Sequence, residues 1–289
     1  MKGIILAGGH GTRLYPITKG VCKQLLPVYD KPMIYYPLSV LMEAGIHDIL
    51  IITLPNAIES FQGIFGDGSS LGISITYAAQ AKPRGIAEAF IVGEEFIGKD
   101  SVCLILGDNI FFGHGLASVL QKAAHQNDGA TIFGYYVNDP ERYGIIQFGS
   151  DNHISKIVEK PSNPISHWAV TGLYFYNNEV IEMAKSLKPS KRKELEITDI
   201  NNIYLERHKL NVELLEHGYA WLDTGTYDAL VEAAMFIKTI EDRQGLKIGC
   251  IEEIAFHLGY IDKQQLKKIA HGYKTSYGKY LLQLSNRSR

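Results

Sequence analysis

A glycine-rich segment followed by a cation lies near the start of the chain. Residues 2–7 form a short apolar run, and the sequence GGHGTR (residues 8–13) follows it. Glycines let backbone N–H groups approach phosphate oxygens without a Cβ in the way, and Arg13 can pair with two of those oxygens. The spacing fits neither the P-loop pattern nor the dinucleotide fingerprint. The segment therefore indicates either a phosphate cradle of another kind or only a tight turn.

Two aspartates each follow a short apolar run. Asp108 comes shortly after the run at 101–106, and Asp223 follows Trp221 and Leu222. Open α/β sheets bind ligands outside the carboxyl ends of their strands, and Mg²⁺ usually binds one or two carboxylates together with substrate phosphates. Either aspartate could instead cap the helix that follows it. The spacing along the chain does not bring the two acids together, so the residues alone leave both interpretations open.

Other polar residues could bind a charged or aromatic ligand. Lys23 adds a cation close to the glycine-rich segment, although a single lysine is often only a solvated surface charge. Glu159 and Lys160 are neighbours, and such a pair on a surface contributes little energy. Gln80 carries both a donor and an acceptor, so it could read the imide edge of thymine or uracil. Gly85 would permit close approach to the flat base.

Strands and helices alternate through the first half of the chain. Short apolar runs bounded by turn residues predict buried parallel strands, and amphipathic segments of helical length separate them. The strands are expected at residues 2–7, 48–54, 101–106 and 130–137. The helices are expected at residues 33–44, 85–97 and 115–126. This alternation predicts an α/β fold with a Rossmann-like, mixed but mainly parallel central sheet flanked by helices on both faces.

The pattern changes after residue 137. Further strands are expected at residues 144–149, 153–159, 169–176 and 210–216, with a turn at 150–152. Helices are expected at residues 226–242, 250–258 and 262–271, the last with Asp262 as its N-cap. The sheet is therefore expected to continue into a mixed half that is followed by C-terminal helices.

Composition and charge exclude several classes of protein. The chain has 289 residues, 46% of them hydrophobic, and a formal net charge of -2. It has no block of lysines and arginines of the kind that binds nucleic acid. The apolar run at the N-terminus is too short for a signal peptide or a membrane span. We therefore expect no membrane partner and a cytoplasmic location. The three cysteines are far apart and form no C-x-x-C pair, so we expect neither a zinc site nor disulfides.

Longer motifs identify a family. The stretches GGHGTRLYPIT and KQLLPVYDKPMIYYPL, together with GDNIFFG, PERYG, EKPSNP, AVTGLYFY, ELEITDIN and WLDTGTYDAL, resemble the signature of the sugar nucleotidylyltransferases. The resemblance covers nearly the whole chain and is greatest to the thymidylyl-transferring branch. It implies an enzyme that transfers the thymidylyl group of dTTP to α-D-glucose 1-phosphate, giving dTDP-glucose and pyrophosphate by a Mg²⁺-dependent in-line displacement. The alternative is an enzyme of this family that prefers UTP or another sugar 1-phosphate.

The resemblance also assigns roles to residues. It implies that Asp108 and Asp223 bind Mg²⁺ and that Arg13, Lys23 and Lys160 are catalytic. The nucleotide is expected to contact Leu6, Gly8, Gly9, Gly11, Thr12, Arg13, Gln80, Pro83, Gly85 and Asp108. The sugar phosphate is expected to contact Gly144, Glu159, Lys160, Val170 and Arg192.

Four positions depart from the usual pattern of the family. Arg84 stands where an acid or amide is common, Ile86 where leucine is common, and Glu88 where glutamine is common. These three put the base preference in question. Lys193 replaces a glycine and puts the affinity for the sugar phosphate in question. None of the departures falls on the expected metal or phosphate residues.

The resemblance implies one catalytic core followed by a helical segment. The core is expected to span residues 1–240, with a nucleotide-binding part at about 1–137 and a sugar-phosphate-binding part at about 138–225. Residues 241–289 are expected to form contacts in a homotetramer. A feedback nucleotide-sugar is a further expected partner of such enzymes.

Two other classes of protein would carry a different set of residues. A non-catalytic relative that only binds nucleotide-sugar should have lost one of Asp108, Asp223, Arg13 or Lys160, and all four are present. A nicotinamide-dependent oxidoreductase on a similar sheet should carry the dinucleotide fingerprint, which is absent here. Both alternatives are therefore disfavoured.

Overall fold

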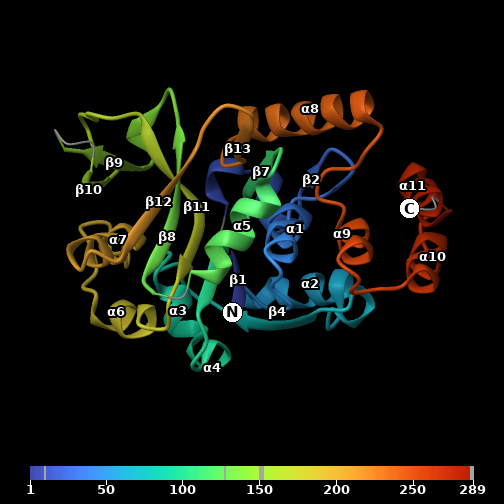
Figure 1. The fold of residues 1–289 in the computed structure, drawn as a ribbon, viewed down its shortest axis with the longest axis horizontal. Helices are drawn as coiled ribbons and strands as arrows, with labels where there is room; N and C mark the ends of the chain where they lie inside the picture. The colour runs from blue at the N-terminus through green and yellow to red at the C-terminus, as the bar shows by residue number, and fades with distance from the viewer. Residues whose placement is uncertain (10, 127, 150–152, 287–289) are drawn as a thin grey trace.

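The computed structural model describes residues 1–9, 11–126, 128–149 and 153–286. Within these residues, nine strands form one central sheet, and helices cover both of its faces (Figure 1). The strand order is β10-β9-β11-β6-β1-β4-β5, and β8 pairs with both β11 and β12. The predicted fold class is confirmed. The turn predicted at residues 150–152 lies outside the described residues.

The first half of the chain supplies a parallel block of four strands. These are β1 (Lys2–Ala7), β4 (Asp48–Thr53), β5 (Ser74–Ala79) and β6 (Val102–Leu106). β1 lies between β4 and β6, and β4 pairs with β5. Because all four strands are parallel, their carboxyl ends meet at one edge of the sheet.

The second half supplies the mixed part of the sheet. Its strands are β8 (Ala130–Tyr136), β9 (Gly144–Phe148), β10 (Ile154–Glu159), β11 (Trp168–Tyr176) and β12 (Leu210–Leu215). β11 pairs antiparallel with both β6 and β8. The run predicted at 130–137 is therefore a buried strand that has the direction of β6, but an antiparallel strand separates the two.

Alternate side chains along the central strands build two cores. Ile5 and Ile105 belong to the cluster on one face, whereas Ile4 and Leu104 belong to the cluster on the other, and all four are fully buried. Burying one such side chain contributes about 1.5–3 kcal/mol. The continuous apolar runs in the sequence follow from burial on both faces.

Helices from distant parts of the chain cover the two faces. The first face is packed by α1 (Tyr35–Glu43), α2 (Ile58–Phe65) and α5 (Leu116–His125), and α9 (Ile251–His257) packs against α1. The second face is packed by α3 (Glu88–Val92), α4 (Glu94–Ile97), α6 (Val180–Ser186) and α7 (Ile197–Glu206). The second face is thus covered by helices from both halves of the sequence, whereas the first face is covered by helices from the first half.

One predicted helix was wrong in its extent. The segment 85–97 forms α3 and α4, which are separated at Gly93, rather than a single helix. A Cβ at Gly93 would lie 2.9 Å from Ile4 Cδ1, so the chain packs tightly against the sheet at this point. Residues 85–87 belong to a loop before α3 and do not form its first turn.

The C-terminal part of the chain is helical. α8 (Tyr227–Gln244) runs along one edge of the molecule, and α10 (Lys263–His271) and α11 (Ser276–Asn286) form the end opposite β9 and β10 (Figure 1). Asp262 caps α10 as predicted, because its Oδ1 accepts a 2.7 Å hydrogen bond from the N–H of Gln265. In the described part of the chain, no helix is long and apolar enough to cross a membrane.

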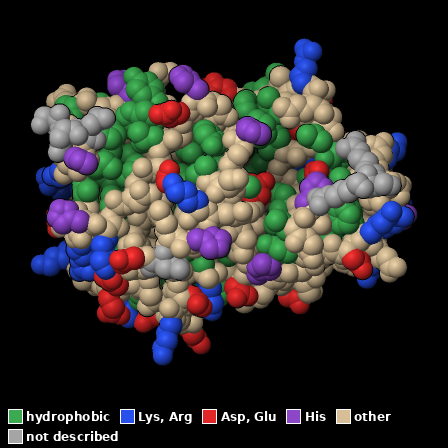
Figure 2. Space-filling model, in the orientation of Figure 1, with side chains coloured by type: hydrophobic (Ala, Val, Ile, Leu, Met, Phe, Trp, Pro, Cys, Tyr) green, Lys and Arg blue, Asp and Glu red, His purple; other side chains and the backbone are tan. Residues whose placement is uncertain are grey.

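Charges are mixed on the molecular surface. On the face seen in Figure 2, acidic and basic side chains are interspersed along the lower edge. This distribution agrees with the formal net charge of -2. A small charged ligand would therefore depend on local clusters of residues rather than on a field from the whole surface.

Candidate active site

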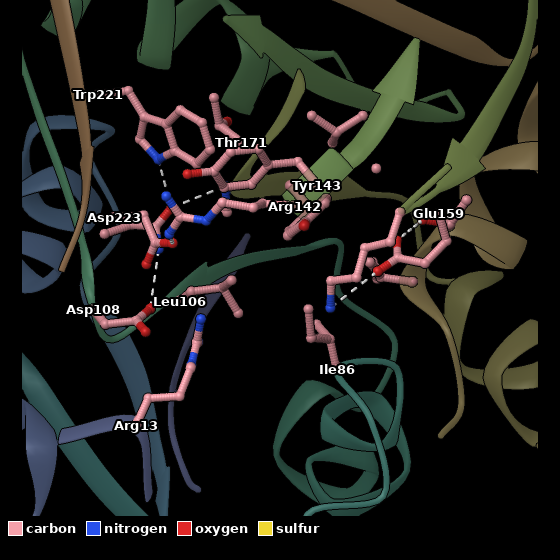
Figure 3. Close-up of a pocket in the computed structure, with 18 residues that line it drawn as sticks. Arg13, Ile86, Leu106, Asp108, Arg142, Tyr143, Glu159, Thr171, Trp221 and Asp223 are labelled. Atoms are coloured by element: carbon pink, nitrogen blue, oxygen red, sulfur yellow. Dashed lines mark hydrogen bonds and ion pairs between the residues drawn. The ribbon is translucent and has the colours of Figure 1, made fainter. Parts of the chain in front are cut away.

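Asp108 and Asp223 lie beside each other although they are far apart in the sequence. Asp108 lies in the turn between β6 and β7 (Asn109–Gly113), and β7 pairs antiparallel with β13 (Tyr219–Asp223). In this pairing Asp223 is opposite Asn109. The two carboxylates consequently meet near the carboxyl end of β6 (Figure 3).

The hypothesis that these aspartates cap helices is wrong. A strand, β7, follows Asp108 rather than a helix. The N-cap of α8 is Thr226, whose hydroxyl accepts from the N–H of Ala229 at 3.3 Å. Neither carboxylate therefore caps the N-terminus of a helix.

Two donors hold the carboxylate of Asp108. Lys23 Nζ lies 2.5 Å from Oδ2, and Asn109 Nδ2 donates to Oδ1 at 3.0 Å. Burial alone would raise the pKa of Asp108, but the adjacent Lys23 ammonium outweighs it and lowers the pKa below the ordinary value. Asp108 therefore stays ionised although it is largely buried.

The pKa of Asp223 is shifted in the opposite direction to that of Asp108. Burial first, and then the negative charge of Asp108, raise the pKa of Asp223 above its ordinary value. Lys23, Arg13 and Arg142 oppose this rise, and Arg142 Nη2 lies 3.4 Å from Asp223 Oδ2. The two acids thus repel each other at a place where a bound cation would relieve the repulsion.

The donor set fits a divalent cation that also binds a substrate. Among the residues that the structure describes, no group of three or more His, Cys, Asp and Glu side chains could hold a metal ion. A hard cation needs only one or two protein carboxylates when substrate phosphates complete its coordination shell. Asp108 and Asp223 could provide those two carboxylates, and a bound cation would relieve their mutual repulsion.

Arg13 lies in the same cavity as the two acids. A Cβ at Gly225 would lie 3.1 Å from Asp223 Oδ1 and 3.2 Å from Arg13 Nη2. Glycine at position 225 thus leaves room for the guanidinium beside the carboxylate. Gly11, with a φ of 57°, precedes the short 3₁₀ helix Thr12–Leu14 that carries Arg13. A left-handed φ of this kind favours glycine.

The cavity in front of these residues has a volume of about 510 Å³, a size typical of ligand sites. Residues from both halves of the chain line it. The predicted site residues among them are Arg13, Asp108, Gly144, Glu159, Lys160, Val170 and Asp223. The two acids and the predicted sugar-phosphate residues therefore face one shared space (Figure 3).

Glu159 is held in a fixed orientation on the wall of this cavity. Thr198 donates its hydroxyl to Glu159 Oε2 at 2.6 Å, and Arg192 Nη2 donates to Oε1 at 3.1 Å. Gly144 is opposite Glu159 in the pairing of β9 with β10. Lys160 follows with a left-handed φ of 44°, and its Nζ lies 3.6 Å from Glu159 Oε1. Such a backbone conformation is costly for lysine and is typical of functional sites.

Arg192 is bound to protein carboxylates rather than lining the cavity. Besides Glu159, its Nη2 lies 3.1 Å from Glu194 and 2.6 Å from Glu196. The structure thus brings Arg192 next to Glu159, one of the predicted sugar-phosphate residues. A phosphate there would compete with three acids for this guanidinium.

The predicted nucleotide residues gather at the carboxyl ends of β1 and β5. Leu6, Gly8, Gly9, Gly11 and Thr12 belong to the end of β1 and the segment after it. Gln80, Pro83 and Gly85 belong to the loop after β5. The side chain of Gln80 reaches Gly8, since a Cβ at Gly8 would lie 2.6 Å from Gln80 Oε1. His10 lies outside the described residues.

Two further residues of the cavity, Asn109 and Arg142, were not predicted from the sequence. Asn109 is 2% exposed, and its Oδ1 accepts from Trp221 Nε1 at 2.6 Å and from the N–H of Gly172 at 3.0 Å. Arg142 forms ion pairs with two acids: its Nη1 lies 2.6 Å from Asp139 Oδ2, and its Nη2 lies 3.4 Å from Asp223 Oδ2. The sequence feature that could have identified these two residues is their position inside GDNIFFG and PERYG, two of the motifs that carry the resemblance.

Comparisons with known proteins agree with this geometry. Residues 2–240 match the nucleotidyl transferase family. The chain is 59% identical over 285 residues to glucose-1-phosphate thymidylyltransferase of Neisseria meningitidis, covering 98% of this chain and 99% of that protein. It is 58% identical over 287 residues to the Xanthomonas campestris enzyme of the same name, covering 99% and 97%.

A solved structure supports the same relationship. A protein from Bacillus anthracis, described as a glucose-1-phosphate thymidylyltransferase and solved in complex with sucrose, superposes with a TM-score of 0.75. The two chains are 44% identical, and the match covers 82% of this chain and 94% of the other. The family match spans most of the sequence, and the relatives are similar over their full length. This chain therefore belongs to the nucleotidyl transferase family and is a nucleotidyltransferase.

Proposed function

We propose that this enzyme transfers the thymidylyl group of dTTP to α-D-glucose 1-phosphate and releases pyrophosphate. The observation that carries the proposal is the shared cavity, in which Asp108, Asp223 and Arg13 face Glu159 and Lys160. The first three residues suit a metal-bound triphosphate, and the last two suit a phosphorylated sugar. The full-length relatives named for this reaction support dTTP over UTP as the donor.

The main obstacle to this reaction is the approach of two anions. The phosphate oxygen of the sugar is already a nucleophile at neutral pH, so no general base is required. Catalysis then depends on positioning and on neutralising charge. Lys160, whose side chain is 46% exposed, would bind the sugar phosphate, and Arg192 would assist it. Glu159, held by Thr198, would accept hydrogen bonds from sugar hydroxyls.

We propose that Asp108 and Asp223 hold Mg²⁺. When bound, this ion would polarise the α-phosphate and offset negative charge on it. Asn109 orients the carboxylate of Asp108, and Lys23 keeps that carboxylate ionised and limits its repulsion with Asp223. Lys23 is 7% exposed and its ammonium donates to Asp108, so we propose that it contributes through this acid.

The other end of the triphosphate would lie on the glycine-rich segment. Arg13 and the backbone N–H groups of Gly8, Gly9 and Gly11 would stabilise pyrophosphate as it leaves, because the leaving group gains charge in the transition state. Leu6 and Thr12 flank this segment, and Gln80, Pro83 and Gly85 would surround the base. The catalytic core would then comprise residues 1–240, with nucleotide-binding residues at about 1–137 and sugar-phosphate-binding residues at about 138–225.

We further propose a homotetramer that binds a feedback nucleotide-sugar. One support is an apolar stripe on α8, where Tyr227, Val231 and Met235 are 42%, 62% and 59% exposed at a spacing of four residues. This spacing places them on one face of the helix. Another support is a second cavity of about 330 Å³, whose lining includes Glu43 and His257. Residues 241–289 would contribute to the subunit contacts.

A grid of substrates tests the proposed reaction. Release of pyrophosphate is measured for dTTP, UTP, dCTP and dATP, each combined with glucose 1-phosphate, galactose 1-phosphate or mannose 1-phosphate. The highest kcat/KM is expected for dTTP with glucose 1-phosphate. A higher value for UTP would favour the alternative donor, and release that does not depend on a sugar phosphate would contradict transfer to a sugar.

A further inference from the structure

Hydrogen bonds connect an exposed arginine to the buried side chain of Gln80 through Glu88. Glu88 is 4% exposed, and its Oε1 accepts from Arg84 Nε at 2.7 Å and pairs with Arg84 Nη2 at 2.6 Å. Its Oε2 accepts from Gln80 Nε2 at 2.7 Å and from the backbone N–H of Arg84 at 3.2 Å. Every one of these partners donates, so the carboxylate acts only as an acceptor.

This arrangement fixes which end of the Gln80 amide faces the glycine-rich segment. A carboxylate paired with a guanidinium has no proton to donate, so the amino group of Gln80 must face Glu88. The carbonyl oxygen then points to the other side. It lies 2.6 Å from the place that a Cβ at Gly8 would occupy, which is space that glycine leaves open. The Gln80 amide therefore presents its carbonyl oxygen, and not its amino group, toward Gly8.

The backbone around Gln80 and Arg84 is fixed, so the amide of Gln80 can change its orientation only by turning about its own side-chain bond. The N–H of Gln80 donates to the carbonyl oxygen of Thr53 at 2.8 Å. The N–H of Leu195 donates to the carbonyl oxygen of Arg84 at 2.7 Å. Gly85 has a φ of 105°, and a Cβ there would lie 2.3 Å from the carbonyl oxygen of Leu195. A reversed amide would set its oxygen against the Glu88 carboxylate, which is unfavourable for a buried pair.

We infer that Glu88 is a positioning residue that sets the base specificity, because it presents the carbonyl oxygen of Gln80 to the nucleotide base as an acceptor. This inference rests on the proposed function, in which the base lies beside Gln80. Thymine and uracil carry an N3–H donor, whereas cytosine carries an acceptor at the same place. A site that hydrogen-bonds one substrate group rejects analogues without it by roughly 10⁴-fold in favourable cases. We expect dTTP to exceed dCTP in kcat/KM by at least about 100-fold.

The variant Glu88→Gln tests the link directly. Only one side-chain oxygen then remains at position 88, and the donors of Arg84 retain it. The new amino group therefore faces Gln80, whose amide turns over and presents N–H to the base. The ratio of kcat/KM for dTTP over dCTP is expected to fall at least about tenfold, mainly through the KM for the nucleotide. The melting temperature is measured beside it as a check on folding.

A double variant is designed to restore the ratio. In Arg84→Glu with Glu88→Gln, the acid at position 84 accepts from the new amino group. The new carbonyl oxygen then returns to Gln80, and the ratio is expected to come back to within about threefold of wild type, a smaller change than the loss of one hydrogen bond. The side chain of Arg84 is 70% exposed, so this position tolerates the change. Lys82→Glu, which changes the charge by the same amount as Arg84→Glu alone and lies on the same exposed loop, serves as the control and is expected to leave the ratio unchanged.

The outcomes separate this inference from the proposed function. If the wild-type enzyme releases no pyrophosphate from dTTP and glucose 1-phosphate, the proposed function fails. If it does, and a folded Glu88→Gln variant keeps the wild-type ratio, only the positioning role is overturned. Where that variant does not fold, Glu88→Asp is measured instead. It keeps the charge but shortens the reach to Gln80, so a lowered ratio supports the role and an unchanged ratio refutes it.

Discussion

The hydroxyl of Thr224 donates a 2.8 Å hydrogen bond to the carbonyl oxygen of Asp108, 116 positions earlier in the chain. The N–H of Thr224 reaches the same oxygen at 3.2 Å. Thr224 is fully buried and directly follows Asp223. The bond between Thr224 and Asp108 therefore holds the two predicted metal ligands together before any ion binds. A site that is already assembled avoids the entropic cost of ordering its ligands at the moment of reaction.

Arg13→Ala tests the residue assigned to the leaving group. Because pyrophosphate gains charge only as the bond breaks, the loss is expected in kcat rather than in sugar binding. We expect kcat to fall about 100-fold, with the KM for glucose 1-phosphate changed less than about threefold. Steady-state kinetics of pyrophosphate release measure both values. Lys19→Ala removes an exposed cation from the same segment as a control, and an equal effect of both variants would refute a specific role for Arg13.

Asn109→Ala tests the support beneath Asp108. The substitution leaves two buried donors, Trp221 Nε1–H and the N–H of Gly172, without their acceptor. We expect the free energy of unfolding to fall by about 2–4 kcal/mol, measured by urea denaturation. Asn211→Ala is the control, since Asn211 is only partly buried and its nearest side-chain partner lies at 3.3 Å. Equal costs for the two variants would contradict the role of Asn109.

Glu43→Gln tests a pH dependence away from the active site. Burial raises the pKa of Glu43 to about 7 in the folded protein, from an ordinary value of 4.5. The folded state thus retains a proton that the unfolded state has lost, so Glu43 lowers stability as pH rises from about 4.5 to about 7. The variant carries no such penalty and is expected to be more stable than wild type by about 1–3 kcal/mol at pH 8.

Two measurements decide that prediction. Urea denaturation at pH 8 and at pH 4.5 compares the variant with wild type, and the difference is expected to vanish at the lower pH. Asp48→Asn, at an exposed acid, is the control and should show no such change between the two values. A constant difference at both pH values would show that burial of Glu43 does not control its ionisation.

The fold could be predicted from the sequence where hydrophobic periodicity was strong. β1 and β6 are buried on both faces, so their continuous apolar runs stood out. The ribbon of β7 and β13 was not predicted, because the two strands that pair lie far apart in the chain. Periodicity reports which face of an element is buried but carries no information about pairing between distant segments.

The residues of the site could be predicted only where they belong to motifs of the family. Residue types alone left Asp108 and Asp223 as either metal ligands or helix caps, and the pairing of β7 with β13 excluded the caps. Arg192 is predicted to contact the sugar phosphate, and its ion pairs with three glutamates in the structure were not foreseen from the sequence. Such side-chain partners depend on the tertiary fold, which spacing along the chain does not record.

Pyrophosphate release from dTTP and glucose 1-phosphate by Asp223→Asn, titrated with Mg²⁺, tests the central claim most directly. The substitution removes one of the two charges proposed to hold the ion, at a residue that caps no helix. We predict a folded protein whose Mg²⁺-dependent kcat/KM is lower by at least about 100-fold. Thr226→Ala, which removes the actual cap of α8, should lose about 1 kcal/mol of stability and keep its turnover. A folded Asp223→Asn enzyme with turnover within about threefold of wild type would contradict the account.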